Sequence, residues 1–343
     1  MKPRLITLAF LLALLAGLPP ALQADGPIAI GVNGAGQLAY DAHLGWVRTG
    51  DYWSNINPSA GVYTFGHADD VVNFSNDHNQ KVLFILSRSP NWCSGATNGN
   101  RPCSIGFWTS YVDQVTRHFA GKVAAYEIWN EPDLINNNTE GVGWDQDLYT
   151  SPTYIDYLVE ASRIIKANDP NALVVGPVVS GKPNSRTSTL FQQLENSWYY
   201  GRNASDYVDV ISGHMDNIDA AHSDDAARFY KENILDKIAT YNPRSRGKEM
   251  WITEFSWRSA GFGEDEQRKR LRNFLIEMTC GAYQWLCGWH FTTGFIYALN
   301  SCASSQDIYY CPNGPQKLVV TYYLWTLPFP AVQPTGAIRE HER

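Results

Sequence analysis

Two glutamates stand where apolar segments of the chain give way to polar residues. Glu131 lies in "YEIWNEPD" (residues 126–133), and Glu254 lies in "EMWITEFSW" (residues 249–257). Two carboxyl groups that face one substrate can act as general acid and as nucleophile, which is the chemistry that cleavage of a glycosidic bond requires. A glutamate after a strand can also be an ordinary loop residue. The elements that hold the two side chains therefore decide between these interpretations.

Eight short apolar segments recur along the chain, and amphipathic segments separate them. Most are rich in β-branched and aromatic residues and end at Gly, Ser, Asn, Thr or Pro, which is typical of strands buried on both faces. They cover residues 28–32, 44–48, 81–86, 124–129, 173–179, 208–213, 249–253 and 285–291. The helical pattern covers residues 107–120, 151–169, 225–241 and 263–280. In the second of these helices, Ser151 is expected to be the N-cap and Pro152 the first helical residue.

Strands that alternate with helices predict an α/β fold, here a single (β/α)8 TIM barrel. The alternative is a doubly wound open sheet. It is disfavoured because no GxGxxG or Walker-type loop follows the first strand. In a barrel, the carboxyl ends of the strands form the catalytic face. Glu131 ends the fourth strand and Glu254 the seventh, so the two carboxyl groups are expected to face each other across the barrel mouth.

Other acidic residues fit this role less well. Glu127 lies four residues before Glu131, which places it too deep in the barrel, and we interpret it as a structural carboxylate. Asp133 follows the proline and is expected in a loop. Asp51 and Asp216 lie near strand ends and remain second-rank candidates.

Several segments resemble a known group of enzymes. "WNEP" (129–132) is similar to the acid/base motif, and "WITEFSW" (251–257) to the nucleophile strand, of the large clan of retaining glycoside hydrolases built on (β/α)8 barrels, clan A. "WVRTGDYWSNINPSAGVYTF" (46–65) and "KVLFILSRSP" (81–90) resemble strands two and three of that clan, most closely its family 39 and family 5-like members. The resemblance extends over most of residues 28–300. It implies that Glu131 is the general acid/base and Glu254 the nucleophile.

The resemblance also implies roles for neighbouring polar residues. Asn130 would bind the sugar 2-hydroxyl, and the strand end must then kink so that Asn130 and Glu131 both face the cleft. Arg48 would lie beside Glu254 and hold it ionised, unless it forms only a structural salt bridge. His214, at the end of strand six, would lie near the nucleophile, or would be a structural histidine.

Aromatic residues would complete the substrate site. The resemblance implies that Trp289, on strand eight, forms the floor of the sugar site and that Trp53 and Trp92 line the cleft. The chain has 12 Trp and 19 Tyr, which suits stacking on sugar rings. Packing in the hydrophobic core is the alternative for each of these tryptophans.

The amino-terminal segment predicts export. Residues 1–24 begin with Lys2 and Arg4, continue with an apolar run from Leu5 to Leu18, and end in the small residue Ala24, which is typical of a secretory signal peptide. An uncleaved anchor is the alternative, although the run is short for a membrane span. We therefore expect a signal peptide over residues 1–24, a catalytic domain over 25–343, and a secreted or periplasmic protein.

All six cysteines follow the predicted signal peptide, and an even number in an exported chain indicates disulfides. Cys93–Cys103 and Cys302–Cys311 are the favoured pairs because each would close a loop rich in Gly, Ser and Asn; Cys280–Cys287 is a weaker prediction. A zinc site is disfavoured because no CxxC pair is present. Neither a metal nor an organic cofactor is expected.

The expected function is a secreted retaining glycoside hydrolase that cleaves β-glycosidic bonds of a polysaccharide or oligosaccharide. Long loops after strands three, four and eight would form the walls of a groove, which favours endo-acting cleavage. The alternative is a catalytically inactive carbohydrate-binding barrel. The net charge of −7, without a cluster of Lys and Arg, disfavours nucleic acids and anionic membranes as partners. The protein is expected to be a monomer, and the sugar and the linkage stay open.

Overall fold

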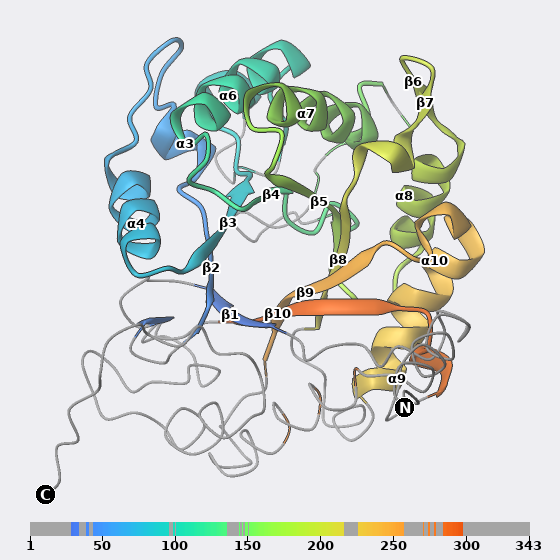
Figure 1. The fold of residues 1–343 in the computed structure, drawn as a ribbon. Helices are drawn as coiled ribbons and strands as arrows, with labels where there is room; N and C mark the ends of the chain where they lie inside the picture. Colours follow the sequence, from blue (N-terminus) through green and yellow to red (C-terminus); the bar gives the residue numbers. More distant parts are fainter. Residues whose placement is uncertain are drawn as a thin grey trace, which may run out of the picture.

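The protein is described from a computed structural model. The described residues are 29–33, 39–40, 44–95, 99, 101–135, 144, 146, 148–149, 151–215, 226–256, 270, 274, 278 and 284–297. They form a closed barrel of eight parallel strands, in the order β1-β10-β9-β8-β5-β4-β3-β2 (Figure 1). The predicted (β/α)8 barrel is therefore confirmed.

The barrel strands are mostly short and almost entirely buried on both faces. They are β1 (Ala29–Asn33), β2 (Trp46–Thr49), β3 (Lys81–Leu86), β4 (Ala125–Ile128), β5 (Leu173–Val179), β8 (Val210–Met215), β9 (Glu249–Phe255) and β10 (His290–Ile296). A separate antiparallel hairpin consists of β6 (Trp198–Tyr199) and β7 (Arg202–Asn203).

Helices cover the outside of the barrel (Figure 1). The α-helices of the described ranges are α3 (Trp53–Ile56), α4 (Gly66–Asp77), α5 (Asn91–Ser94), α6 (Ile105–His118), α7 (Tyr154–Asn168), α8 (Ser185–Asn196), α9 (Ala226–Tyr230) and α10 (Asp236–Tyr241). A π-helical turn, η3 (Lys231–Leu235), joins α9 to α10. Short 3-10 turns are η2 (Ala204–Tyr207), η4 (Pro243–Ser245) and η5 (Gln284–Leu286).

The start of α7 differs from the prediction. The helix begins at Tyr154, and its N-cap is Thr153 rather than Ser151. The Thr153 side chain and the side chain of Asp156 form a capping box, which satisfies two backbone N–H groups of the first turn. A reciprocal pair of caps therefore determines this helix start, and not the serine that precedes Pro152.

The last barrel strand also differs from the prediction. It covers His290–Ile296, five residues after the predicted start of the segment 285–291. Trp285 and Leu286 belong to η5, and Gly288 has a φ of +91°, a left-handed conformation that ends the turn before the strand begins. Trp289 therefore precedes the strand and lies at its amino end.

The interior of the barrel is divided into two layers. One layer is a cluster of apolar side chains: Trp46, Leu83, Ala125, Val175, Val178, Val210, Trp251 and Phe295. Two residues further along several of these strands, on the same faces, the side chains are polar. Arg48 follows Trp46, and Glu127 follows Ala125. The apolar layer therefore closes the barrel below a buried polar layer at the carboxyl ends of the strands.

Several predictions fall partly or wholly on residues outside the described ranges. They concern the signal peptide at 1–24, most of the helix at 263–280, and Cys280, Cys302 and Cys311. These stay predictions, as does the domain boundary at residue 25. Within the described ranges, no helix is both long and apolar enough to cross a membrane.

Asp133 connects the loop after β4 to the loop after β5 and to α8. It is fully buried. Its Oδ1 accepts from the Ser180 backbone N–H at 2.9 Å, and its Oδ2 accepts from Ser180 Oγ, Asn184 Nδ2 and Thr187 Oγ1 at 2.9, 3.0 and 2.8 Å. Four donors therefore depend on one carboxylate two residues after Glu131.

Replacing Asp133 by Ala should lower the free energy of unfolding by about 3 kcal/mol, because several buried donors lose their acceptor. Chemical denaturation of the purified variant measures this loss. The matched control is Asp236→Ala, which removes an exposed ion pair with Lys231 and should cost no more than about 0.5 kcal/mol. Equal losses in the two variants would contradict the role assigned to Asp133.

Candidate active site

Arg48, at the end of β2, connects three side chains from two other strands. Its Nε donates to Glu127 Oε2 at 2.9 Å, and its Nη2 donates to Glu127 Oε1. Its Nη1 donates to Glu254 Oε1 at 2.5 Å, and Nη2 also donates to Asn130 Oδ1 at 3.0 Å. The guanidinium therefore lies between the deep carboxylate on β4 and the carboxylate on β9, as a planar fork of donors allows.

The charge of Arg48 is stabilised by these carboxylates. Burial opposes the charged form of the guanidinium, but the charges and hydrogen bonds of Glu127 and Glu254 outweigh this effect and raise the pKa of Arg48 above its usual range. Arg48 is therefore a permanent cation, and the expected contact with Glu254 is confirmed. Glu127 lies below the mouth as expected, but it reaches the site through Arg48, which it holds in place from below.

The end of β4 is bent where Asn130 and Glu131 follow the strand. Trp129 has a φ of +67° and Glu131 a φ of +48°, both in the left-handed region that L-residues rarely adopt. As a result, Asn130 contacts Arg48 while the adjacent Glu131 contacts His214. The expected kink is therefore present, and it brings neighbouring side chains into one site.

The packing of Trp129 stabilises this strained turn. Its indole lies edge-on to Trp108 and Trp144, at centroid distances of 5.9 and 4.9 Å. Its backbone N–H donates to Leu86 O on β3. Strained residues persist only where the surrounding structure determines them, and they concentrate at functional sites. The bend before Glu131 is strained in this sense, and the packing of Trp129 holds it in place.

A register shift between β8 and β9 orients Glu254. Ser212 is paired with Trp251, whereas His214 is paired with Glu254, so β9 contains one extra residue between these pairs. A bulge of this kind turns consecutive side chains to the same side. Thr253 and Glu254 accordingly both reach His214: Thr253 Oγ1 lies 3.1 Å from Nε2, and Glu254 Oε2 lies 3.6 Å from Nδ1.

His214 lies between the two glutamates. Its Nδ1 is 2.9 Å from Glu131 Oε1. Burial disfavours the imidazolium, but the charge of Glu254 and the hydrogen bond and charge of Glu131 outweigh burial and raise the pKa of His214 to about 9. Both ring nitrogens then carry protons, so Nδ1–H donates to Glu131 and Nε2–H donates to Thr253. Ser212 Oγ, 2.7 Å from Thr253 Oγ1, continues this chain into the barrel.

The two glutamates are close together because they share one nitrogen. Glu131 Oε1 and Glu254 Oε2 both contact His214 Nδ1, at 2.9 and 3.6 Å. The distance between these two oxygens therefore cannot exceed the sum of the two contact distances. Retaining glycosidases hold their carboxyl groups about 5–5.5 Å apart and inverting enzymes about 6.5–9.5 Å apart. The arrangement is compatible with the shorter class.

The three tryptophans occupy different environments. Trp53 is fully buried in α3 and stacks on Tyr111 at 4.7 Å, so it belongs to the core and does not line a cleft. Trp289 lies at the amino end of β10, below Arg246, at the opposite end of the barrel from Glu131. The expectation that Trp289 forms the floor of the sugar site is therefore wrong, because the strand begins after it. Trp92 is half-buried on α5, in the loop after β3.

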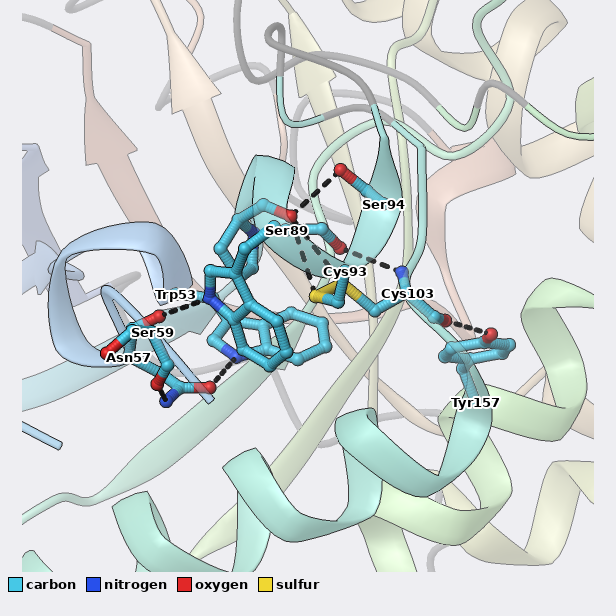
Figure 2. Close-up of a disulfide and its surroundings, with 10 residues drawn as sticks. Trp53, Asn57, Ser59, Ser89, Cys93, Ser94, Cys103 and Tyr157 are labelled. Atoms are coloured by element: carbon cyan, nitrogen blue, oxygen red, sulfur yellow. Dashed lines mark hydrogen bonds between the residues drawn. A yellow bond between two sulfur atoms is a disulfide. The ribbon is translucent and has the colours of Figure 1, made fainter. Parts of the chain in front are cut away.

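A disulfide and a hydrogen-bond network fix the loop after β3. Cys93 and Cys103 are bonded, as predicted (Figure 2). Trp92 Nε1 donates to Asn57 O at 2.9 Å, and Tyr157 Oη donates to Cys103 O at 2.5 Å. These contacts connect the loop after β3 to the loop after β2 and to α7. They give one side of the barrel mouth a rigid wall. Cys287 is also disulfide-bonded.

Sequence reasoning missed two supports of the site. Ser212 and Thr253 position His214, and inward alternation along β8 and β9 was the signal that could have identified them. Asp51, a second-rank candidate, contacts Asn55 and His67 instead of the glutamates, and Asp216 lies outside the described ranges. Among the described residues, no group of three or more His, Cys, Asp or Glu is arranged to hold a metal ion.

Replacing Arg48 by Met should lower the free energy of unfolding by about 3–5 kcal/mol, because two buried carboxylates lose their partner. Adding Glu127→Gln to this variant should recover part of the loss, since one unpaired charge is removed. Urea denaturation of both variants measures the effect. As a surface control, Arg117→Met breaks an exposed pair with Asp113 and should leave the free energy of unfolding nearly unchanged. An equally small effect for Arg48→Met would rule out the buried network.

The imidazolium of His214 should make stability depend on pH. Its pKa is raised in the folded state, so its contribution is complete below the unfolded value of about 6.5 and is lost as pH rises through about 9. The free energy of unfolding should therefore fall between pH 6.5 and 9.5, and this fall should be absent in His214→Gln. The control His118→Gln, at an exposed histidine paired with Asp69, should retain it. An identical pH profile for His214→Gln and the native protein would show that His214 is neutral.

Comparisons with known proteins agree with the fold. A model of glycosyl hydrolase family 10 matches residues 49–176, from the end of β2 into β5. The chain is 25% identical over 128 residues to Endo-1,4-beta-xylanase 1 of Humicola insolens, over 36% of this chain and 28% of that protein. It is 30% identical over 83 residues to a Beta-1,4-xylanase of Dictyoglomus thermophilum, over 23% of each chain. The matches thus span about a quarter of the length of these relatives.

Solved structures show the same barrel. A family 39 glycoside hydrolase from Bacteroides cellulosilyticus superposes with a TM-score of 0.57 at 17% identity, over 85% of this chain and 61% of that chain. Xylanase 10B from Thermotoga maritima superposes with a TM-score of 0.58 at 16% identity, over 85% of this chain and 92% of that chain. At such identities the superpositions establish the fold. With the family 10 match, they confirm the resemblance to the clan, and family 10 joins family 39 among its similar members. The chain is similar to the clan A retaining glycoside hydrolases, which are built on (β/α)8 barrels.

Proposed function

We propose that the protein is a retaining glycoside hydrolase that cleaves β-glycosidic bonds within a polysaccharide. One observation carries this proposal. Glu131 and Glu254, from opposite sides of the barrel, reach the same nitrogen of His214 at the carboxyl ends of the strands. Two carboxyl groups at one level of one mouth can serve the two roles that double displacement needs.

In the first step, Glu254 attacks the anomeric carbon. Its Oε1 accepts the hydrogen bond from Arg48, so Oε2 is the oxygen available for attack. Glu131 donates its proton to the glycosidic oxygen, the bond to the leaving sugar breaks, and a glycosyl ester forms on Glu254. In the second step, Glu131 takes a proton from water as the water attacks the anomeric carbon, and the bond to Glu254 breaks to release its carboxylate. Two inversions leave the anomeric configuration unchanged.

The charges around the site suit these roles. Arg48 and His214 are cations, and they balance the carboxylates of Glu127 and Glu254. When Glu131 carries its proton the cluster is neutral, and the charge of Glu254 remains as the largest influence that keeps His214 protonated. His214 Nδ1–H donates to Glu131 Oε1, so Oε2 is the oxygen that carries the proton to the leaving group. In each glutamate, Oε1 is therefore held by Arg48 or His214, and Oε2 is the oxygen that reacts.

The proposed substrate is a β-linked polysaccharide, and β-1,4-xylan is the first polymer to test. The names of the curated relatives, both xylanases, support this choice. Endo-acting cleavage is supported by the disulfide that fixes the loop after β3, at the carboxyl ends of the strands, as one wall of the proposed groove. Export through the predicted signal peptide would bring the enzyme to such a polymer. An inactive sugar-binding barrel, the alternative function, would bind such a polymer without hydrolysing it.

Replacing Glu254 by Gln should reduce kcat on a cleaved polymer by about 10⁴-fold or more, because the nucleophile is lost; each tenfold corresponds to about 1.4 kcal/mol of barrier. A 2-fluoro sugar inactivator should label Glu254 in the native protein, as peptide mapping by mass spectrometry would show. The control Glu232→Gln changes an exposed glutamate on η3 and should retain full activity. Labelling of another residue would show that Glu254 is not the nucleophile.

The stereochemistry of the product provides an independent measurement. An NMR time course should show a first-formed product with the anomeric configuration of the substrate. If the opposite anomer is formed first, water attacks directly and Glu254 is a base instead of a nucleophile. If the native protein cleaves no polysaccharide in a broad panel, the inactive barrel is the better description.

A further inference from the structure

The β6–β7 hairpin presents two large aromatic side chains to solvent. Trp198 is 62% exposed and Tyr200 is 64% exposed. Tyr200 and Gly201 have left-handed φ values of +51° and +78°, and Trp198 pairs with Asn203 across the two-residue turn. This is the geometry of a tight hairpin with the right-handed twist of its strands. Tyr199, between the two exposed residues, is half-buried and donates to Asp156 on α7.

Ion pairs hold both rings in place. The Arg163 guanidinium lies 3.8 Å from the centre of the Tyr200 ring, and Glu160 joins the two: it accepts from Tyr200 Oη at 2.6 Å and from Arg163 at 2.9 Å. We define the hairpin platform as Trp198 and Tyr200 together with the charged residues beside them, which are Glu160, Arg163, Glu195 and Arg244. Because the Tyr200 ring is restrained, binding on its open face costs little side-chain entropy.

Trp198 has a similar support. Arg244, on η4, lies 5.8 Å from the centre of the indole and forms an ion pair with Glu195 at 2.9 Å. Each exposed ring of the hairpin platform therefore has an arginine beside it, and each arginine has a glutamate. The cationic charges are balanced locally, so the platform combines open aromatic faces with donors and acceptors but carries little net charge.

The hairpin platform lies on the outside of the barrel, where Tyr200 contacts Glu160 and Arg163 on α7. The hairpin follows the carboxyl end of α8 and leads through η2 into the amino end of β8 (Figure 1). Arg244 likewise precedes the amino end of β9. Glu131 and Glu254 lie at the carboxyl ends of the strands, so a ligand on the platform would not occupy the catalytic mouth.

We propose that the hairpin platform is a second, non-catalytic binding site for a neutral polysaccharide chain. Flat C–H faces of pyranose rings stack on open aromatic rings, while the hydroxyl groups accept from guanidinium N–H groups and donate to carboxylates. A protein partner fits less well. Aromatic side chains bury about 150–250 Å² each, whereas a stable protein interface needs about 800 Å² from each partner.

Such a site would keep the enzyme on its polymer between cleavage events. Weak binding at a second position raises the effective concentration of chain at the first. The choice of polymer rests on the proposed function, but the existence of the site does not. The experiment therefore measures binding and hydrolysis separately.

Binding is measured in a Glu254→Gln background, so that the probe polymers stay intact. Mobility in native gels containing soluble xylan, mixed-linkage β-glucan or anionic carboxymethyl cellulose gives an affinity for each polymer. Replacing Trp198 and Tyr200 together by Ala should weaken binding to at least one neutral polymer about tenfold. Tyr200→Phe keeps the ring and its contact with Arg163 but loses the bond to Glu160, and it should bind more tightly than the double variant. Tyr40→Ala, which removes a less exposed aromatic packed on His78 at the C-cap of α4, is the matched control.

Hydrolysis is measured with the same hairpin changes in the otherwise native protein. Activity on a short soluble substrate should stay unchanged, while activity on the bound polymer at low concentration should fall. Unchanged binding of the double variant to every polymer would overturn the proposal. So would a change in sedimentation from dimer to monomer, because it would assign the platform to self-association. Hairpin-dependent binding without any hydrolysis would support the second site and contradict the proposed function. Hydrolysis without hairpin-dependent binding would support the proposed function and contradict the second site.

Discussion

The carboxyl half of the barrel depends on the buried cation Arg48. A guanidinium and two carboxylates, removed from water, are stable only if their geometry and hydrogen bonding are nearly complete. Arg48 meets this condition with four hydrogen bonds, to Glu127, Glu254 and Asn130. Glu127 and Glu254 lie on β4 and β9 and Asn130 follows β4, so the contacts of Arg48 determine how β2, β4 and β9 lie relative to one another at this level. The apolar layer below them can then pack without any polar group of its own.

Two local irregularities bring the glutamates to this cation and to His214. A regular β4 would turn Asn130 and Glu131 to opposite faces, and a regular β9 would turn Thr253 and Glu254 to opposite faces. Left-handed residues at the end of β4 and an extra residue in β9 remove these conflicts. Both irregularities cost backbone energy, and both lie beside the residues assigned to catalysis. The surrounding packing, above all of Trp129, offsets this cost.

The sequence predicts the barrel and the two glutamates because these depend on strong local signals. Buried parallel strands leave continuous apolar segments, and polar residues at their ends stand out. The kink before Glu131 could also be inferred, since Asn130 and Glu131 are adjacent. The bulge in β9 could not, because it follows from pairing with β8 and leaves no mark in the segment itself. The position of Trp289 could not be predicted for a related reason. The segment "WLCGWHF" is mostly apolar and resembles a strand, but a turn at Gly288 precedes the strand, which begins only at His290.

His214 connects the two halves of the proposed reaction cycle. Before attack, the negative charge of the catalytic pair is on Glu254, and after the glycosyl ester forms it is on Glu131. The Nδ1–H of His214 contacts both carboxyl groups, at 2.9 Å and 3.6 Å, so it has an anionic neighbour in each state. Only the position of the counter-charge changes, and the imidazolium need neither lose its proton nor move far. Preorganised charges of this kind avoid the reorganisation that water would require, which is how a buried site can stabilise charge that shifts between two groups.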